Sequence, residues 1–378
     1  MFGAGEAAGK SAAMRVDNVH ASKVSDGDVA AWRALLSADP ELSSPYFTPD
    51  WTQLVARHRG DVRVAVFHDD IGAPLGFLPV QLGDHGAAMP VGGPICDYQA
   101  FIGPAGLDLS DAAKSLGVGR IDLTAGLANN AVGESLLTHD KGHVVRFEKG
   151  FQHWCDQRAA KGSKTIARTR KKLSKLAREH DGDVAVEAFS TDSVAFETLL
   201  RWKREQMRRT GVKDVFQRAW IHGVVRECFA APVGNSEFGG AMFVLRVKGA
   251  PAAVLFCLRA RKTLHAWFVA HDEALSAHSP GLILFVEAIR AAAEASYTEM
   301  DLGPGDYRFK ESLANYARPV GAGFLGRPGL STALKTAQFQ MRALVESLPV
   351  GPAREWPAKA MRRFDIARGL AVPSSRAA

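Results

Sequence analysis

The segment MDLGPGDYRFKESL, residues 300–313, places three chemically capable side chains around a tight turn. An apolar run ends at Asp301, a Gly-Pro-Gly turn follows, and Tyr307 and Lys310 stand three residues apart. Asp301 could orient or deprotonate a nucleophile, Tyr307 could protonate a leaving group, and Lys310 could hold an anionic group. The structural alternatives are a carboxylate that caps nearby amides, a core aromatic residue and a solvated lysine.

A second candidate group, His-Ser-Pro-Gly at residues 278–281, opens a long apolar helix. The start of a helix exposes unpaired N–H groups and a partial positive charge, so it accepts phosphate oxygens. Pro280 suits the first helical turn, Gly281 allows close approach of a ligand, and His278 and Ser279 could add donors. The alternative is that Ser279 only caps the helix, and we expect this cap in either case.

The segment TLHAWFVAH, residues 263–271, predicts a strand with candidate substrate contacts. Strict alternation would place His265, Trp267 and Val269 on one face and Phe268 on the other. His265 and Trp267 could then line an acceptor groove, in which an aromatic face suits a sugar ring. A buried histidine with satisfied hydrogen bonds is the competing interpretation.

Two segments carry the excess of positive charge. Residues 161–180 hold eight Lys/Arg against one Glu, and residues 327–378 hold nine against three acidic residues. The first segment predicts an amphipathic basic helix, which either simply docks by its apolar stripe or binds a lipid headgroup, a lipid-linked sugar diphosphate or RNA. The segment has no interleaved aromatic residue for base stacking, so nucleic acid is not favoured and no DNA partner is expected. The stripe consists of Ile166, Thr169, Leu173 and Leu176.

The second basic segment predicts a helix over residues 356–370. Such a helix could lie peripherally in a membrane interface or dock on the preceding domain. Paired arginines with an aspartate can also grip the phosphates and guanine edges of a cyclic dinucleotide such as cyclic di-GMP. The candidate nucleotide or lipid contacts are Arg362, Arg363, Asp365 and Arg368.

The order of apolar runs indicates an internal duplication. Residues 62–80 and 241–258 both predict a β-hairpin with Gly-Ala-Pro in the turn. Each is followed by an Ala-rich helix and a strand that ends in Asp-Leu-x-x-Gly, with Asp122 and Asp301 as equivalent positions. We therefore predict an α/β fold with a mixed sheet, built from two related domains. Coincidence between common patterns is the alternative.

The second copy predicts helices over 192–210, 217–230 and 280–296, and a final strand near 320–326. The predicted organisation comprises five consecutive segments. These are a disordered N-terminus at 1–20, a first domain at 21–150, a basic linker helix at 151–185, a second, catalytic domain at 186–326 and a basic amphipathic tail at 327–378.

Composition limits the class of protein. The 378 residues suffice for two domains, and contents of 47% apolar and 23% charged residues are typical of soluble globular proteins. No window offers the roughly 20 apolar residues of a membrane span, so we expect a cytoplasmic protein, at most peripheral to the inner face of the membrane. The four cysteines are scattered without a CxxC pair, so neither a disulfide framework nor a metal site is expected.

The segments HSPGLILFVEAI (278–289) and YTEMDLGPGDYRFKESL (297–313) together resemble the CelD / FemAB-like GNAT acetyltransferase family of bacterial exopolysaccharide and cellulose synthesis. SPYFTPDW (44–51) and TRKKLSKLARE (169–179) stand where that family has a Pro-Phe…Trp segment and a basic linker helix. The resemblance spans about residues 44–326, and the holdfast-polysaccharide acetyltransferases are a looser match. It implies tandem GNAT-like domains.

The resemblance also implies a chemistry, which is N-acetylation by acetyl-CoA of an amino sugar or sugar precursor for an exopolysaccharide, holdfast or biofilm. In that reaction Asp301 would act on the acceptor amine, Tyr307 on the leaving thiolate and Lys310 on an anionic group, while residues 278–281 would contact the coenzyme. The general GNAT pyrophosphate loop, Arg/Gln-x-x-Gly-x-Gly/Ala, is absent, so the resemblance alone implies this donor.

Lys203 and Gln206 match a Lys-x-x-Gln pattern of the same family and join His265 and Trp267 as candidate substrate contacts. Two other functions stay open. One is a Fem-type transferase that uses aminoacyl-tRNA on a cell-wall precursor. The other is a non-catalytic regulator that binds a cyclic dinucleotide or a membrane through its C-terminal tail.

Overall fold

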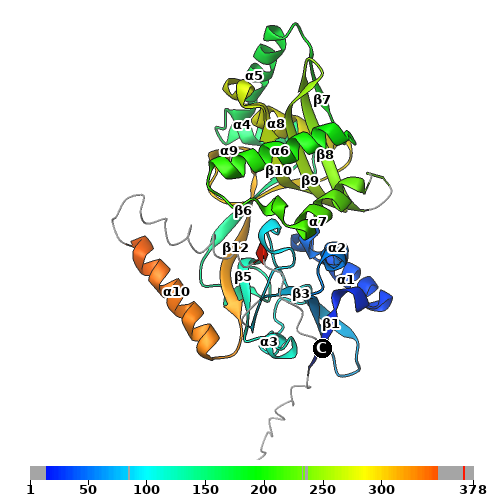
Figure 1. Ribbon diagram of the computed structural model, residues 1–378, viewed down its shortest axis with the longest axis vertical. Helices are drawn as coiled ribbons and strands as arrows, with labels where there is room; N and C mark the ends of the chain where they lie inside the picture. Colours follow the sequence, from blue (N-terminus) through cyan, green and yellow to red (C-terminus); the bar gives the residue numbers. More distant parts are fainter. Residues whose placement is uncertain (1–13, 84–85, 232, 235–236, 348–368, 371–378) are drawn as a thin grey trace, which may run out of the picture.

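The computed structural model describes residues 14–83, 86–231, 233–234, 237–347 and 369–370. In this part of the chain all named strands join one mixed sheet in the order β1-β2-β3-β4-β5-β12-β6-β11-β10-β9-β8-β7. Figure 1 shows the first half of the chain below the second, with β6 and β12 passing between them. The predicted mixed α/β fold class is therefore confirmed.

The strands are β1 (Arg15–His20), β2 (Val62–His68), β3 (Pro74–Leu82), β4 (Ala87–Met89), β5 (Arg120–Leu127), β6 (Asp140–Arg146), β7 (Val184–Glu187), β8 (Phe238–Val247), β9 (Ala250–Ala260), β10 (Thr263–His271), β11 (Glu299–Pro304) and β12 (Tyr316–Leu325). The α-helices are α1 (Asp26–Ala38), α2 (Pro49–His58), α3 (Ala112–Ser115), α4 (Phe151–Ala160), α5 (Thr165–Glu179), α6 (Ser193–Arg209), α7 (Ala219–Ala230), α8 (Pro280–Glu294), α9 (Arg308–Leu313) and α10 (Leu330–Ser347).

The two halves exchange strands. β6, the last strand of the first half, pairs antiparallel with β11 of the second half, with Val144 opposite Asp301. β12 follows the second half in sequence, yet it pairs with β5 and β6, with Val320 opposite Leu127. Each half thus holds a strand that the other half's segment of the chain supplies. The sheet runs without a break across the predicted domain boundaries, which stay predictions.

Both predicted hairpins are present. β2 pairs with β3 and β8 pairs with β9, all antiparallel. Gly72 and Gly249 occupy their turns at φ of 86° and 75°, a region that favours glycine because it has no side chain. The predicted Asp-Leu-x-x-Gly motif lies at the end of a strand in both copies, because β5 ends at Leu127, one residue after the motif, and β11 ends at Pro304 within it.

Two apolar cores pack against the sheet and meet the strands around β10. One lies under α1, α2, α6 and α7 and includes Trp32, Leu54, Phe196 and Trp220, so it joins both halves. The other lies under α4, α5 and α8 and includes Trp154 and Ile283. These cores hold β10, β11 and the start of α8 in fixed positions relative to the first half.

The basic linker helix is α5. Its residues Ile166, Thr169 and Leu176 are buried, so the predicted docking by an apolar stripe is confirmed. The predicted disorder of residues 1–20 is wrong for Arg15–His20, which form β1 and pair with β2. Arg362, Arg363, Asp365 and Arg368 lie outside the described residues.

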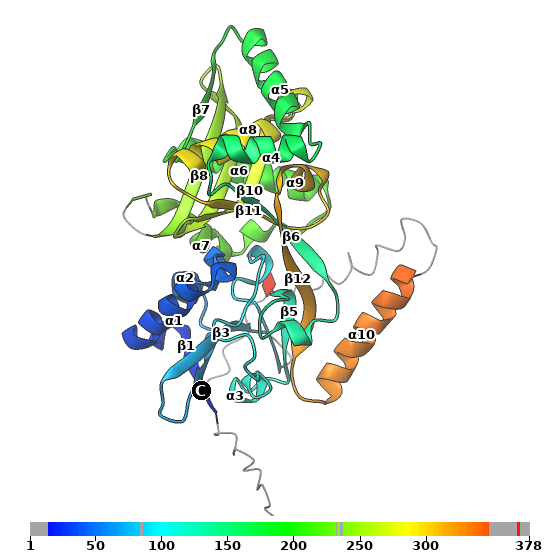
Figure 2. The same cartoon turned by 180° about the vertical axis from the view of Figure 1, so that it is seen from behind.

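α10 follows β12 along the outside of the first half (Figure 2). One of its faces exposes large apolar side chains, whereas Lys335 and Phe339 on another face are buried. None of the described helices combines the length and the apolarity needed to cross a bilayer. The exposed side chains of α10 are Leu330, Leu334, Met341 and Leu344.

Candidate active site

The candidate site centres on the point where β10 and β11 separate. The two strands pair in parallel only from Thr263 to His265 and from Glu299 to Asp301, although β10 continues to His271. The edge of β10 beyond His265 therefore has no partner in β11. Separated parallel strands of this kind leave backbone groups open to a ligand.

A β-bulge interrupts β10 between Ala266 and Phe268. Trp267, Phe268 and Ala270 all pack toward the core that joins the halves, whereas Ala266 and Val269 pack toward the other core. The predicted alternation that placed Val269 on the face of Trp267 is therefore wrong. Bulges insert an extra residue and redirect the side chains that follow, and hydrophobic alternation alone does not reveal them.

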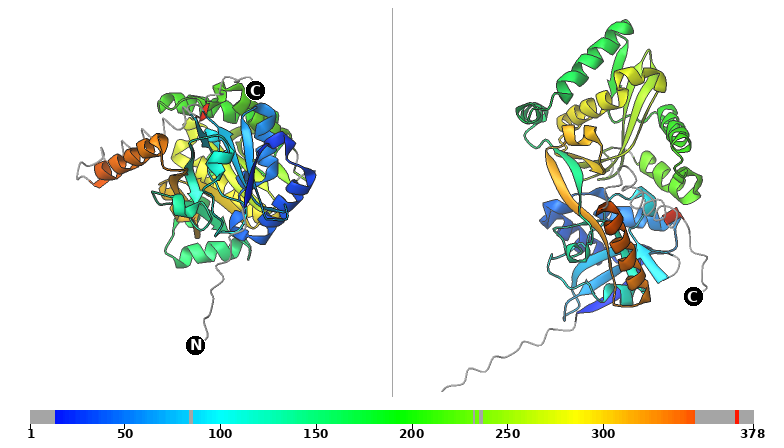
Figure 3. Two further views of the ribbon diagram at one scale, coloured as in Figure 1. Left: turned by 90° about the horizontal axis from the view of Figure 1, so that it is seen from below. Right: turned by 90° about the vertical axis from the view of Figure 1, so that its left-hand side faces the viewer.

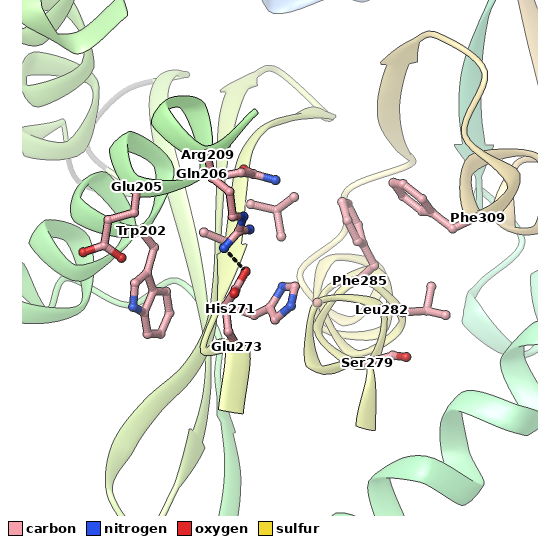
Figure 4. Close-up of a pocket in the computed structure, with 13 residues that line it drawn as sticks. Trp202, Glu205, Gln206, Arg209, His271, Glu273, Ser279, Leu282, Phe285 and Phe309 are labelled. Carbon is pink, nitrogen blue, oxygen red and sulfur yellow. Dashed lines mark ion pairs between the residues drawn. The ribbon is translucent and has the colours of Figure 1, made fainter. Parts of the chain in front are cut away.

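A cavity of about 390 Å³, here called the α8 cavity, lies along the free edge of β10. Figure 4 shows α6 side chains on one side and those of α8 on the other, with His271 between them. An ion pair between Arg209 and Glu273 lies at its edge. The lining residues are Trp202, Glu205, Gln206, Arg209, Val269, Ala270, His271, Glu273, Ser279, Gly281, Leu282, Phe285 and Phe309.

The start of α8 borders this cavity, as the sequence predicts for a ligand contact. Ser279 precedes the helix at φ 54° and ψ 55°, in the left-handed region, and its side chain makes no capping hydrogen bond. The predicted Ser279 cap is therefore wrong. Its hydroxyl instead accepts a hydrogen bond from Lys172 Nζ of α5, at 2.6 Å. The left-handed backbone points the hydroxyl away from the first turn and toward the basic helix.

His278 lies beside the same helix. Its Nε2 is 3.0 Å from Glu179 Oε2 of α5. Ser279 and Gly281 line the cavity and Pro280 occupies the first turn, whereas His278 turns to α5. The start of α8 thus combines helix N–H groups with a lysine ammonium, two features that bind anions.

Asp301 lies on β11 and is fully buried. Its Oδ1 accepts hydrogen bonds from Tyr98 Oη at 2.8 Å and from the Gly303 N–H at 2.7 Å. Arg318 Nε, on β12, lies 3.5 Å from Oδ2. Burial and the charge of Asp301 raise the pKa of Tyr98 well above its usual value, which keeps the phenol protonated as a donor. The carboxylate is therefore held between the halves with no direct contact to solvent.

His265 links Asp301 to the surface. Its Nδ1 lies 3.7 Å from Asp301 Oδ1, and its Nε2 lies 2.8 Å from Oδ2 of Asp97. The His265 side chain is 0% exposed, whereas that of Asp97 is 41% exposed. The three side chains therefore form a row that runs from the partly exposed carboxylate of Asp97, through the buried imidazole of His265, to the buried carboxylate of Asp301. Asp97 and Tyr98 were not predicted from the sequence, because they lie on a loop of the first half with no motif around them.

Lys310 and Tyr307 lie together at the start of α9. Lys310 Nζ donates to the Pro304 carbonyl at 2.8 Å and lies 5.2 Å from the centre of the Tyr307 ring. Tyr307 is 55% exposed, so it is not a core aromatic residue. Lys310 closes the turn that follows β11. Lys310 and Tyr307 therefore lie beside each other, whereas the partners of Asp301 named above are Tyr98, Gly303 and Arg318.

The remaining candidate contacts divide between two places. Lys203 Nζ donates to Gln206 Oε1 at 2.8 Å, burial lowers the pKa of Lys203, and Gln206 lines the α8 cavity. Trp267 Nε1 donates to the Ile95 carbonyl at 2.8 Å, and its ring packs against Trp51. His265 and Trp267 thus face the first half and do not line this cavity.

The cysteines do not supply a nucleophile. Burial raises the pKa of all four thiols above the usual value, so they stay protonated at neutral pH. Among the described residues, no group of three or more His, Cys, Asp or Glu side chains is arranged to hold a metal ion.

Part of the second half is similar to a known family of domains. Residues 160–311 match the family model described as acetyltransferase (GNAT) domain. No curated protein sequence shows significant similarity to the chain. Among solved structures the chain is similar to FemX, with 10% identity, a TM-score of 0.52 and coverage of 82% of this chain and 98% of FemX. This likeness shows a shared fold.

Two further solved structures are similar over most of their length. One is L-PGS from Bacillus licheniformis, with 12% identity, a TM-score of 0.43 and coverage of 82% of this chain and 95% of that chain. The other is a tandem GNAT protein from the clavulanic acid biosynthesis pathway, with 11% identity, a TM-score of 0.48 and coverage of 84% and 100%. The matched family model includes the start of α8, Asp301 and Lys310. Residues 160–311 therefore form a GNAT-type acetyltransferase domain, and the protein is an acyltransferase.

Proposed function

We propose that the protein transfers the acetyl group of acetyl-CoA to the amine of an amino sugar or sugar precursor in exopolysaccharide synthesis of the cellulose or holdfast type. The observation that carries the donor assignment is the α8 cavity, which joins an anion-binding helix start to the free edge of β10. The acceptor class is supported by the resemblance of residues 278–313 to the exopolysaccharide acetyltransferases. We place the reaction in the cytoplasm.

The lining of the α8 cavity fits the donor. Val269, Leu282, Phe285 and Phe309 supply apolar walls that suit a pantetheine arm. The first turn of α8 and Lys172 supply positive charge for a diphosphate. When bound, acetyl-CoA supplies an activated thioester.

The residues of the chain then have separate tasks. The backbone amides on the free edge of β10 stabilise the developing oxyanion, because fixed N–H donors act strongly in a site that excludes water. Lys310 holds the turn after β11 through its bond to the Pro304 carbonyl, and the exposed Tyr307 hydroxyl can donate a proton to the leaving sulfur. Asp301 acts through His265, because its carboxylate is buried.

Calorimetry with acetyl-CoA tests the donor assignment. A Cβ at Gly281 would meet only ordinary contacts, with His271 Nδ1 at 3.7 Å the nearest atom, so Gly281→Leu should fold while its side chain fills the cavity. We expect wild-type protein to bind acetyl-CoA and Gly281→Leu to bind at least about tenfold more weakly. Gly106→Leu is the matched control, because a Cβ at this loop glycine meets nothing within 4 Å. No uptake by the wild type would refute the proposal.

A Fem-type use of aminoacyl-tRNA is the second candidate, and two observations favour it. The fold is shared with FemX, and α5 carries exposed Lys171, Lys175 and Arg178. Gel shift with tRNA at physiological salt separates the candidates. Binding that is lost in Lys171→Glu/Lys175→Glu, together with no binding of acetyl-CoA, would establish the tRNA donor.

A further inference from the structure

We infer that a second cavity, on the far side of the turn after β11, binds the acceptor and that Asp97 receives the proton of its amine. This inference rests on the proposed acyl transfer and adds the acceptor site, its base and the chemical class of its ligand.

The second cavity, here called the α10 cavity, has a volume of about 480 Å³. It lies between the sheet, the turn after β11 and α10, which runs beside β5 and β12 (Figures 2 and 3). The charged residues that line it include Asp97, Asp122, Asp140, Asp306, Lys335 and Arg342.

The two cavities share the segment that follows β11. Pro304, Gly305 and Asp306 line the α10 cavity, whereas Phe309 lines the α8 cavity. Residues 304–309 therefore border both cavities, so we infer that donor and acceptor meet beside this short segment. Lys310 fixes its shape by donating to the Pro304 carbonyl. Direct transfer of an acyl group requires that the donor site and the acceptor site lie next to each other.

Asp97 stands at the rim of the α10 cavity, next to this segment. It combines partial exposure with a buried hydrogen-bond partner, since His265 Nε2 lies 2.8 Å from its Oδ2. The carboxylate also packs on the turn, because a Cβ built on Gly303 would lie 2.9 Å from Asp97 Oδ2. Gly303 has φ of 77°, so both its conformation and this contact require glycine. The Gly-Pro-Gly turn thus brings Asp97 against the end of β11.

The buried residues behind Asp97 fix its orientation. His265 Nδ1 and Asp301 Oδ2 have no hydrogen-bond partner in the structure, although both residues are 0% exposed. Tyr98 and Arg318 hold Asp301 in turn. His265 is therefore a positioning residue that presents Asp97 to the cavity, and Asp97 is the catalytic residue.

The charges on the walls indicate the ligand. The carboxylates come from the sheet and its loops, and one of them, Asp122, pairs with Arg120 Nε at 2.8 Å. The cationic side chains that line the cavity, Arg342 and the buried Lys335, come from α10. Opposite charges on different walls fit a small molecule that carries an ammonium group at one end and an anionic group at the other. The ligand class is therefore a phosphorylated primary amine, which is the chemistry of an amino sugar phosphate.

In the proposed step the acyl group passes directly from the sulfur of the donor to the nitrogen of the acceptor. Asp97 accepts one proton from the ammonium, and the freed lone pair forms a C–N bond with the thioester carbonyl carbon. The C–S bond breaks with its electron pair on sulfur, and the nitrogen loses a second proton, which neutralises the thiolate. An amide and a free thiol leave, and the proton on Asp97 returns to solvent at its exposed edge.

Binding is tested with the full chain, CoA and glucosamine 6-phosphate as the probe, by calorimetry. We expect binding that weakens at least about tenfold for glucosamine, which lacks the phosphate, and for glucose 6-phosphate, which lacks the amine. Thr124→Trp should weaken it similarly, because the exposed Thr124 lines the α10 cavity and tryptophan is compatible with a strand. Absence of probe binding, or equal binding by Thr124→Trp, would overturn the inference.

Turnover tests the base. We expect Asp97→Asn to lower kcat for glucosamine 6-phosphate about 100-fold, with acetyl-CoA affinity unchanged and partial recovery in Asp97→Glu. His265→Gln should lower kcat with little change in KM, as a positioning role requires. Asp17→Asn is the matched control, because Asp17 is 40% exposed and pairs with His68 Nε2 at 3.2 Å, in β1.

The outcomes separate the two proposals. A wild type that binds no acetyl-CoA refutes the proposed function. A wild type that binds acetyl-CoA, with Asp97→Asn folded and fully active on the probe, refutes only the assignment of Asp97.

Discussion

His265 and Asp301 occupy the last paired positions of the parallel strands β10 and β11, and His265 Nδ1 lies 3.7 Å from Asp301 Oδ1. The strands separate immediately beyond this pair. The buried imidazole and carboxylate therefore stand at the apex of the opening, with the α8 cavity along the edge of β10 and Asp97 on the side of the first half. His265 and Asp301 of the acyltransferase domain thus contact Asp97 and Tyr98, which the first half contributes.

Removal of the Lys172 ammonium should weaken donor binding. Lys172 Nζ donates to Ser279 Oγ at the start of α8, where the proposed diphosphate would lie. We expect Lys172→Ala to raise the Kd for acetyl-CoA about tenfold, which corresponds to about 1.4 kcal/mol. Lys171→Ala removes an exposed charge from the same helix and is the control in calorimetry. An equal loss of acetyl-CoA affinity in both variants would indicate that the positive charge of the helix attracts the coenzyme in general and that Lys172 makes no specific contact with it.

Substitutions after β11 should affect turnover more than binding. Lys310→Ala removes the bond to the Pro304 carbonyl, so the segment between the two cavities loses its fixed shape. We expect turnover to fall by about ten- to a thousandfold, the range for groups that act in the transition state. Arg308→Ala, at an exposed position of α9, is the control. Wild-type turnover in a folded Lys310→Ala protein would remove this lysine from the mechanism.

Two buried tyrosines provide a matched test of stability. Tyr98 Oη donates to the buried carboxylate of Asp301, whereas Tyr46 Oη has no hydrogen-bond partner in the structure. Tyr98→Phe should lower the free energy of unfolding by about 1–3 kcal/mol, because it leaves a buried acceptor with one donor fewer. Tyr46→Phe should leave the free energy of unfolding unchanged or raise it by up to about 1–3 kcal/mol, because it removes a buried hydroxyl without a partner. Urea midpoints at constant m-value measure both, and equal losses would contradict the described bond.

The stability of the protein should depend on pH through Lys203. Burial lowers the pKa of Lys203 in the folded protein, whereas an unfolded lysine titrates near ~10.4. Between the two pKa values the unfolded chain binds the proton and the folded protein does not, so the free energy of unfolding rises with pH in that window. Lys203→Met removes this rise. Its stability relative to wild type should be highest at neutral pH and should decline toward pH ~10.

Urea unfolding at several pH values measures this difference. Lys213→Met, at an exposed position after α6, controls for the loss of one positive charge. A difference between Lys203→Met and wild type that stays constant over the whole range would contradict the effect of burial on Lys203.

Local patterns were sufficient to predict the hairpins, β10 and α8. Gly-Ala-Pro turns between β-rich runs mark β2–β3 and β8–β9, and an apolar period with Pro280 at its start marks α8. Gly303 was also predicted as part of the Gly-Pro-Gly turn, whereas the bond of Lys310 to the Pro304 carbonyl was not predicted. These elements depend on neighbours in sequence, which is why sequence reasoning reaches them.

Contacts between distant segments were not predictable in this way. Tyr98 and Asp301 lie 203 residues apart, and Asp97 and His265 lie 168 residues apart, so no local period joins them. The Ser279 cap failed because Lys172, 107 residues earlier, binds the hydroxyl and the backbone turns left-handed. The exchange of β6 and β12 between the halves was likewise not predicted, because the strand expected near 320–326 carries no local sign of its partners β5 and β6.

The exchange of strands has a consequence for biosynthesis. β1 to β5 emerge from the ribosome long before β12 is synthesised. The strand position between β5 and β6 therefore stays empty until residues 316–325 have emerged. Until then β5 keeps an edge with unpaired backbone N–H and C=O groups, and such an edge can pair with exposed strands of other chains. A polypeptide truncated before residue 316 should therefore aggregate, and the buried pair of His265 and Asp301 should gain its Arg318 partner only after β12 has been synthesised.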